Sequence, residues 1–219
     1  PGAQDAQEVL TEKRNKPVAI RAYLPGKATI MKKCYELLQD PRFARGFRVL
    51  NMGGEQKGDP KTGIFPCGES DGEPAWAVAQ WESRWDFRDP AQTVSTRPEP
   101  GVFSWDSRDK VFTVDTNTNT LGMELNAGLV YDAPRVVNQG WPHLLVENAT
   151  VRQPLKELSA MRLSWEQRLT MFRDHMGAAA DPLLHAGSFY IHLYIKGVND
   201  RGLEEMLWFG LTLFDNRFD

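Results

Sequence analysis

Two tyrosines, a histidine and a lysine stand at every second position of the segment 187–197. Tyr190, His192, Tyr194 and Lys196 alternate with Phe189, Ile191, Leu193 and Ile195. Because side chains of a β-strand point to opposite faces with period two, one face would be apolar and the other polar. A neutral imidazole accepts a proton and a phenol donates one, as β-elimination of an acidic polysaccharide requires. The pattern makes His192 a candidate base, and Tyr190 or Tyr194 the candidate acid.

The same face could bind sugar rings without cleaving them. Tyrosine rings offer stacking area together with a hydroxyl group for hydrogen bonds. Lys196 could neutralise a uronate or a sulfate. The structural alternative is a solvent-facing strand, since tyrosine is a good strand former.

Three carboxylates extend the list of candidates. Glycoside hydrolysis needs two carboxylates across a cleft. Glu82, Glu124 and Glu147 all lie in predicted strand regions, and Glu124 and Glu147 are taken as further catalytic candidates. Singly, each of them is more often a solvated charge on a strand.

Aromatic residues near these carboxylates are candidates for substrate binding. Trp81 precedes Glu82, and Trp141 and His143 precede Glu147 by a few positions. We expect Trp81, Trp141 and His143 to help Lys196 in binding a substrate.

Cofactor motifs are absent or incomplete. The sequence lacks a zinc pattern, a complete phosphate-binding loop and a G-x-S-x-G elbow. Asp115, Asn117 and Asn119 alternate like the first calcium ligands of an EF-hand, but Thr120 replaces the required glycine. A hairpin loop explains the same residues, so we expect no cofactor other than a possible structural calcium.

Short alternating segments separated by turn residues dominate the chain. We predict strands at 18–23, 46–52, 75–87, 109–115, 120–132, 142–151, 161–172, 187–197 and 205–215, and one helix at 28–41. The segment 158–172 also fits a helical stripe. Glycine and proline mark loops at 51–74 and 88–101. The pattern predicts one mainly β domain over 1–219, a two-sheet antiparallel β-sandwich of the jelly-roll type with a short N-terminal helix. Residues 1–50 would form a strand-helix-strand segment and 75–219 the core.

Composition narrows the class of protein. The 219 residues carry a net charge of −3, so no basic field is present to attract nucleic acid. No apolar run approaches the roughly 20 residues that span a bilayer, and a soluble protein is expected. Cys34 and Cys67 could form a disulfide or remain thiols, and Asn148 begins a glycosylation tripeptide. We expect a secreted, periplasmic or cell-surface protein, with its oligomeric state open.

The segments FTVDTNTNTLGMELN, MRLSWEQRL, SFYIHLYIKG and MLWFGLTLFD resemble the concanavalin A-like lectin/glucanase superfamily of jelly rolls, over residues 75–219. In that superfamily the concave sheet carries the sugar-binding or catalytic residues. YIHLYIKG is similar to the Tyr-and-His strands of jelly-roll alginate lyases. It has Tyr-Ile-His where those enzymes have Gln-Ile-His, and the R-T-E-L-R and E-x-D-x-x-E strands are missing. The resemblance implies polysaccharide binding or cleavage in general.

The function predicted from the sequence is engagement of a polysaccharide or oligosaccharide on a concave sheet face. An enzyme would be a lyase or a glycoside hydrolase. The alternatives are a glycan-binding module without catalysis and a protein-interaction domain.

Overall fold

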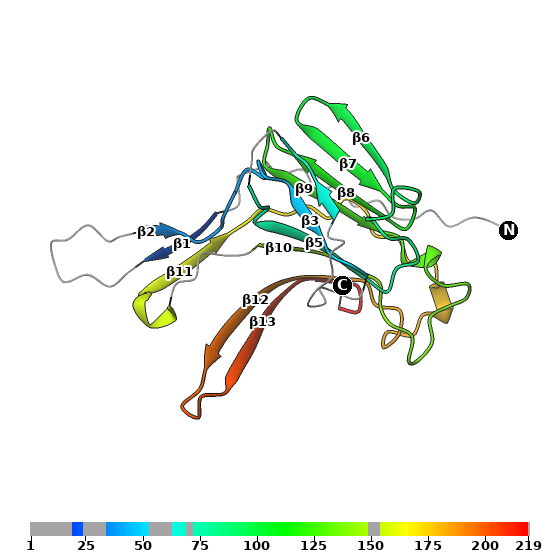
Figure 1. Ribbon diagram of the computed structural model, residues 1–219. Coiled ribbons are helices and arrows are strands. Elements are labelled where there is room, and N and C mark those ends of the chain that lie inside the picture. Colours follow the sequence, from blue (N-terminus) through cyan, green and yellow to red (C-terminus); the bar gives the residue numbers. More distant parts are fainter. Residues whose placement is uncertain (1–18, 24–33, 53–62, 69–71, 149–153, 219) are drawn as a thin grey trace. The chain divides into compact units, whose positions relative to one another are not determined.

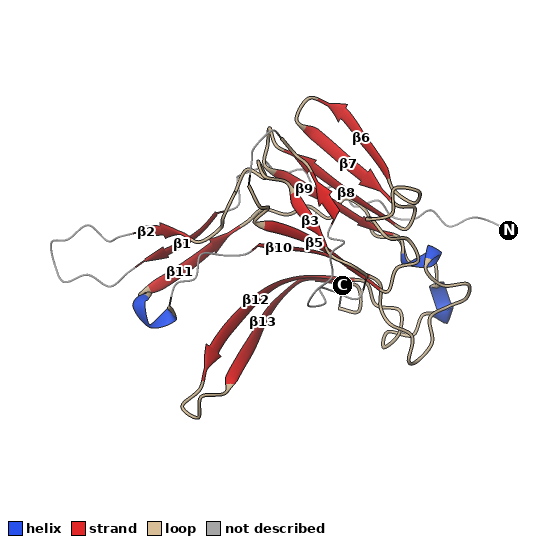
Figure 2. Ribbon diagram, viewed as in Figure 1, coloured by secondary structure: helices blue, strands red, loops and turns tan. Residues whose placement is uncertain are grey.

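The computed structural model describes residues 19–23, 34–52, 63–68, 72–148 and 154–218. Their regular structure is almost entirely β, and the helical segments among them are single 3₁₀ turns (Figure 2). In these ranges no helix is long and apolar enough to cross a membrane. The prediction of a mainly β chain is confirmed.

The chain divides into two compact units. Unit 1 comprises Pro1–Asp132 and Gly140–Phe172, and unit 2 comprises Ala133–Gln139 and Arg173–Asp219. Three sheets belong to unit 1 and a two-stranded hairpin to unit 2 (Figure 1). The single-domain organisation expected from the sequence stays a prediction.

Sheet B of unit 1 has the strand order β10-β5-β3-β4. These strands are β10 (His143–Asn148), β5 (Trp76–Trp81), β3 (Phe47–Val49) and β4 (Gly63–Phe65). β5 pairs antiparallel with β10 and parallel with β3, and the parallel pair departs from the antiparallel prediction. Val78 contributes to one apolar cluster, whereas Ala77 and Ala79 contribute to another. β5 is therefore a central strand that is covered on both faces, which fits its nearly continuous apolar sequence.

Sheet C of unit 1 is an antiparallel meander in the order β6-β7-β8-β9. Its strands are β6 (Val94–Glu99), β7 (Val102–Asp106), β8 (Lys110–Asp115) and β9 (Thr120–Leu125). β6 is exposed throughout and contains Pro98, which is tolerated because β6 is an edge strand. The loop predicted at 88–101 therefore contains a strand, and the loop predicted at 51–74 contains β4.

One apolar cluster draws side chains from both of these sheets. Its buried members are Phe43, Phe47, Val49, Phe65, Cys67, Val78, Phe87, Phe103, Trp105, Phe112 and Val114. The rings of Phe65 and Trp105 are stacked with centroids 4.2 Å apart. Those of Phe47 and Phe112 meet edge to face at 5.0 Å. Since each fully buried large apolar side chain contributes about 1.5–3 kcal/mol, this cluster is the main source of stability in unit 1.

A buried polar network lies beside the apolar cluster. The side chains of Lys110 and Asp109 are fully buried, and their charged atoms Nζ and Oδ1 are 3.0 Å apart. Lys110 Nζ also donates to Ser83 Oγ at 2.6 Å and to the carbonyl oxygen of Trp85. All three protons of the ammonium group thus have acceptors. Desolvation by burial lowers the pKa of Lys110, although hydrogen bonding to Asp109 opposes that shift.

Sheet A corrects the predicted helix. It consists of β11 (Ala160–Ser164), β1 (Ala19–Tyr23) and β2 (Cys34–Glu36). The predicted helix spans 28–41, but Cys34–Glu36 is a strand paired with β1, and residues 24–33 lie outside the described residues. Leu37 and Leu38 are buried together, packed against partly buried neighbours such as Trp76. Pairing with β1 satisfies the main chain here, and this tertiary contact overrides the helical spacing of the apolar residues.

The predicted strand at 161–172 is only partly correct. Pairing with β1 ends at Ser164, and residues 165–172 have no regular structure. The alternating pattern of 165–172 therefore lacks a partner strand within the described residues, and the alternative helix is not formed either.

Unit 2 contains the longest strands of the described chain. β12 (Ser188–Val198) pairs antiparallel with β13 (Glu204–Asp215), and both strands bend along their length (Figure 1). The turn is held by Asn199, whose side-chain oxygen accepts from the N–H groups of Arg201 and Leu203. Gly202 has a φ of +76°, which glycine adopts without strain. The strands predicted at 187–197 and 205–215 are confirmed.

Candidate functional site

The polar face of the hairpin carries the four side chains singled out in the sequence. Tyr190, His192, Tyr194 and Lys196 lie opposite Thr212, Gly210, Trp208 and Met206 on β13, respectively. Residues that are directly opposite in an antiparallel pair share a face. The opposite face is apolar, with Ile191, Leu193 and Ile195 facing Leu211, Phe209 and Leu207.

Aromatic rings on the polar face form a continuous row. The rings of Tyr190 and His192 are stacked at 5.6 Å, and those of His192 and Tyr194 lie 6.5 Å apart. Trp208 joins from β13, with its ring 4.9 Å from that of Tyr194 and 5.1 Å from that of His192. Tyr194 and Trp208 are 40 % and 52 % exposed, so a flat ligand can reach both rings.

A hydrogen bond from Trp208 fixes the tautomer of His192. The indole Nε1–H donates to His192 Nδ1 at 2.6 Å. An indole nitrogen only donates, so Nδ1 carries no proton and the neutral ring carries its proton on Nε2. Held in this way, His192 presents a hydrogen-bond donor to a ligand. Its role as a general base, predicted from the sequence, would require the loss of this hydrogen bond.

Gly210 makes room for the imidazole. A Cβ atom at position 210 would lie 3.0 Å from His192 Nδ1 and 3.3 Å from its Cε1. The ring of His192 therefore lies against the main chain of β13, where its Nδ1 meets the Trp208 indole.

The far end of the ring row is tied to a charged pair. Tyr190 donates its hydroxyl proton to Asp215 Oδ2 at 3.2 Å, and Arg217 Nε donates to Asp215 Oδ1 at 2.8 Å. Hydrogen bonding from Arg217 holds the pKa of Asp215 well below its ordinary value, and the bond from Tyr190 acts in the same direction. Because Asp215 stays ionised, it holds the hydroxyl proton of Tyr190 in this hydrogen bond. That proton points toward Asp215, so Tyr190 is poorly placed to give it to a substrate as the acid.

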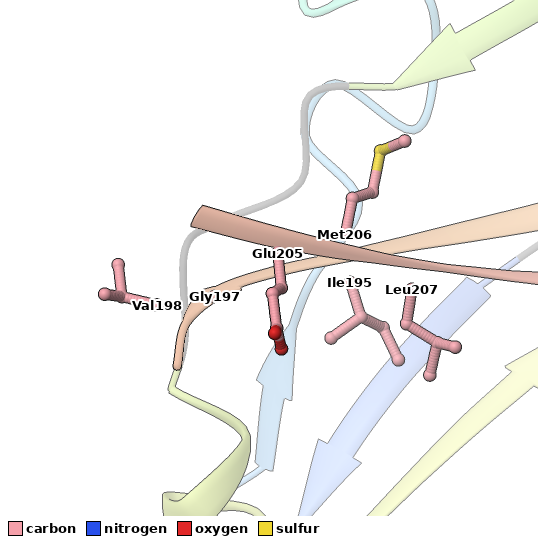
Figure 3. Close-up of a pocket in the computed structure, with 6 residues that line it drawn as sticks. All are labelled: Ile195, Gly197, Val198, Glu205, Met206 and Leu207. Carbon is pink, nitrogen blue, oxygen red and sulfur yellow. The ribbon is translucent and has the colours of Figure 1, made fainter. Parts of the chain in front are cut away.

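A hollow lies near the turn of the hairpin. It is lined by Ile195, Gly197, Val198, Glu205, Met206 and Leu207. Ile195 and Leu207 point to one side of the ribbon and Met206 to the other (Figure 3). None of the predicted site residues lines this hollow.

The remaining predicted residues lie in unit 1, where the two carboxylates belong to different sheets. Leu144 and Val146 pack toward the shared core, so Glu147 faces outward from sheet B. Glu124 is exposed and lies opposite Val111, on the face of sheet C that points away from buried Phe112. Both carboxylates therefore point away from the shared apolar cluster, on faces of two different sheets, and they are not seen facing each other across a cleft.

Trp81 and His143 do come together. They are direct cross-strand neighbours on β5 and β10, with ring centroids 5.7 Å apart in an edge-to-face arrangement. Glu147 is on the same face of sheet B, opposite Ala77. Trp141 is partly buried just before β10.

The proposed calcium residues form a turn between β8 and β9. Asp115 accepts hydrogen bonds from the Asn117 main-chain N–H at 2.9 Å and from the Thr118 hydroxyl at 2.6 Å. The hairpin-loop interpretation of this segment is confirmed. Within the described ranges no group of three or more His, Cys, Asp or Glu residues is placed to hold a metal ion.

Cys67 is a free, buried thiol. Desolvation by burial is the main cause that raises its pKa to about 12, and the charge of Asp40 adds to it. The Asn148 side chain exchanges two hydrogen bonds with the main chain of Gln39, at 3.2 and 2.9 Å, so a glycan there would disturb this link.

Trp208 and Gly210 were not among the site residues predicted from the sequence. Both lie in a segment that was correctly predicted as a strand, and the polar turn at 199–203 favours a hairpin. A hairpin register drawn from that turn would have paired Tyr194 with Trp208.

Comparison of the chain with protein-family models, curated proteins and solved structures found no match.

Proposed function

We propose that this protein binds a carbohydrate chain on the polar face of the β12–β13 hairpin, without cleaving it. The observation that carries the proposal is the row of rings formed by Tyr190, His192, Tyr194 and Trp208. Aromatic faces take the apolar face of a sugar ring, and hydroxyl and N–H groups at their edges bind its oxygen atoms.

The donors along the row support this function. His192 offers its Nε2–H, and Lys196 extends the row with an exposed ammonium group. Sugars, uronates and sulfates are rich in acceptor oxygens. The row is therefore suited to a chain of several sugar units rather than to one small molecule.

Cleavage at the same face is the second candidate, and the placement of His192 between two phenols favours it. The bond from Trp208 to His192 Nδ1 and the bond from Tyr190 to Asp215 favour binding alone. Hydrolysis by Glu124 and Glu147 receives no support from their positions, because each points away from the apolar cluster that sheets B and C share.

The architecture belongs to the proposal. We infer that sheets B and C, which share the apolar cluster, are the two layers of a β-sandwich related to jelly rolls. The parallel pairing of β3 with β5 would be an addition to the usual antiparallel pattern.

A panel of acidic and neutral polysaccharides tests the function. Affinity electrophoresis should show retardation by at least one of them, and Trp208→Ala should weaken that binding about tenfold or more. Phe218→Ala is the matched control, because Phe218 is an exposed ring of the same unit outside the row. Assays for unsaturated ends and for reducing sugar report cleavage. Absence of binding to the whole panel would refute the proposal, and turnover abolished by His192→Ala would favour the lyase.

A further inference from the structure

A second candidate site lies in unit 1, where an aromatic residue and a glutamate follow each other at the end of β5. Trp81 is the last residue of β5 and Glu82 follows it directly. One side of Trp81 packs on the small cluster of Leu50, Ala77 and Ala79. The ring also meets His143, which is exposed at the start of the edge strand β10.

The position of Glu82 depends on Gly140. A Cβ atom on Gly140 would be 2.1 Å from Glu82 Cδ and 2.5 Å from its Oε2. The carboxylate therefore lies directly over the main chain of Gly140, in space that only a glycine leaves open. Glu82 itself has a φ of +52°, a conformation that non-glycine residues rarely adopt and that turns its side chain away from the line of β5.

The segment that faces Glu82 is anchored. Tyr131 donates its hydroxyl proton to the carbonyl oxygen of Gly140. Three residues further on, His143 enters the pairing with Trp81. The main chain from Gly140 to His143 is held at both ends, and Glu82 and Trp81 each lie against one end of it.

The charge at this place is negative. Arg84 is paired with Asp132 at 2.8 Å, which leaves the Glu82 carboxylate uncompensated by that cation. No ion pair or hydrogen bond of the Glu82 carboxylate occurs with any described residue. An exposed carboxylate accepts strong hydrogen bonds from hydroxyl groups, and it repels anionic ligands.

We propose that Trp81 and Glu82 form a second carbohydrate site that takes a neutral sugar ring. The indole takes the apolar face of the ring, and the Glu82 carboxylate accepts hydrogen bonds from its hydroxyl groups. His143 borders the site from β10. This site differs in chemistry from the hairpin face, whose free groups are donors, and it does not depend on that face.

Isothermal titration calorimetry of the full chain with neutral hexasaccharides (cellohexaose, xylohexaose and mannohexaose) tests the proposal. At least one of them should bind, and Glu82→Gln and Gly140→Ala should each weaken that binding about tenfold. Gly140→Ala keeps the carboxylate and only displaces it, so it separates position from charge. Glu99→Gln, at an exposed glutamate of β6 in the same unit, is the control and should change nothing. Circular dichroism confirms that each variant folds.

The variant Trp208→Ala distinguishes the two sites. Binding that Glu82→Gln weakens and Trp208→Ala leaves intact supports the second site. Binding that only Trp208→Ala weakens overturns the second site and leaves the proposed function standing. If only Glu82→Gln weakens binding of the hexasaccharide and no acidic polysaccharide binds the hairpin face, the proposed function is overturned and the second site stands. Absence of binding to every hexasaccharide overturns the second site.

Discussion

Replacing Lys110 by methionine should destabilise unit 1 strongly. The side chains of Lys110 and Asp109 are both fully buried. Lys110→Met keeps the volume of the side chain but removes the ammonium group, which leaves the carboxylate of Asp109 buried without its cation. Breaking a buried pair in this way costs about 3–5 kcal/mol.

One hydrogen bond narrows the expected loss for Lys110→Met, and two further variants serve as comparisons. Ser83 Oγ is 2.5 Å from Asp109 Oδ2, so the carboxylate keeps one hydrogen bond after the mutation, which places the loss toward the lower end of that range. The double variant Asp109→Asn/Lys110→Met removes both charges and should recover a large part of the stability. Arg84→Met breaks the exposed pair with Asp132 and should change the stability little, because solvent screens that pair.

Urea denaturation followed by tryptophan fluorescence and far-UV circular dichroism measures these differences. A loss below about 1 kcal/mol for Lys110→Met would place the pair in the range of exposed ion pairs. That result, or a double variant no more stable than the single one, would refute the account of the buried network.

Three further predictions concern pH, reactivity and backbone conformation. Arg217 lowers the pKa of Asp215 below its ordinary 3.8, so this group contributes fully to stability above pH 3.8 and progressively less as the pH falls. Asp215→Asn should therefore flatten the acid side of the stability curve of unit 2, as measured by circular dichroism, and an unchanged curve would contradict the role of the pair. Because the pKa of Cys67 is raised to about 12, its thiol should resist iodoacetamide at pH 8 in the native protein and react in urea. Mass spectrometry measures the alkylation, and rapid alkylation of Cys67 in the native protein would contradict its burial. Gly46 has a φ of +71°, and a Cβ there would lie 2.2 Å from the Phe65 carbonyl oxygen, so Gly46→Ala should cost more than about 3 kcal/mol. Gly202→Ala, with a φ of +76° and open space around it, should cost only about 1–2 kcal/mol in the same urea experiment, and equal losses would refute the steric argument.

Alternation was a reliable signal where a strand has a partner along its whole length. It predicted β12 and β13, whose pairing runs from Ser188 to Val198. The same signal failed at 165–172, because alternation does not reveal whether a partner strand exists. The helical spacing at 28–41 failed for a related reason, since pairing of Cys34–Glu36 with β1 is a long-range contact.

Composition misled the prediction of two loops. β6 contains Pro98, and β4 lies in a glycine-rich window, yet both pair with neighbouring strands. Short edge strands tolerate proline and need little apolar sequence of their own.

The candidate site was predictable in part. The shared face of Tyr190, His192, Tyr194 and Lys196 followed from the period of a strand. The contact of His192 with Trp208 depends on register and on the absence of a side chain at Gly210. The outward orientation of Glu124 and Glu147 depends on which faces of sheets B and C carry the shared apolar cluster. Local spacing in the sequence encodes neither the register of the hairpin nor the choice of these faces.

The most direct test of the hairpin as a binding face is the indole N–H signal of Trp208 in a ¹H–¹⁵N spectrum. The chain has seven tryptophans, and Trp208→Phe assigns the signal. We predict that titration with the polysaccharide fragment that binds best shifts the Trp208 indole signal in step with the signals of the main-chain N–H groups of His192 and Tyr194. Saturable binding that leaves all three signals in place would contradict the account.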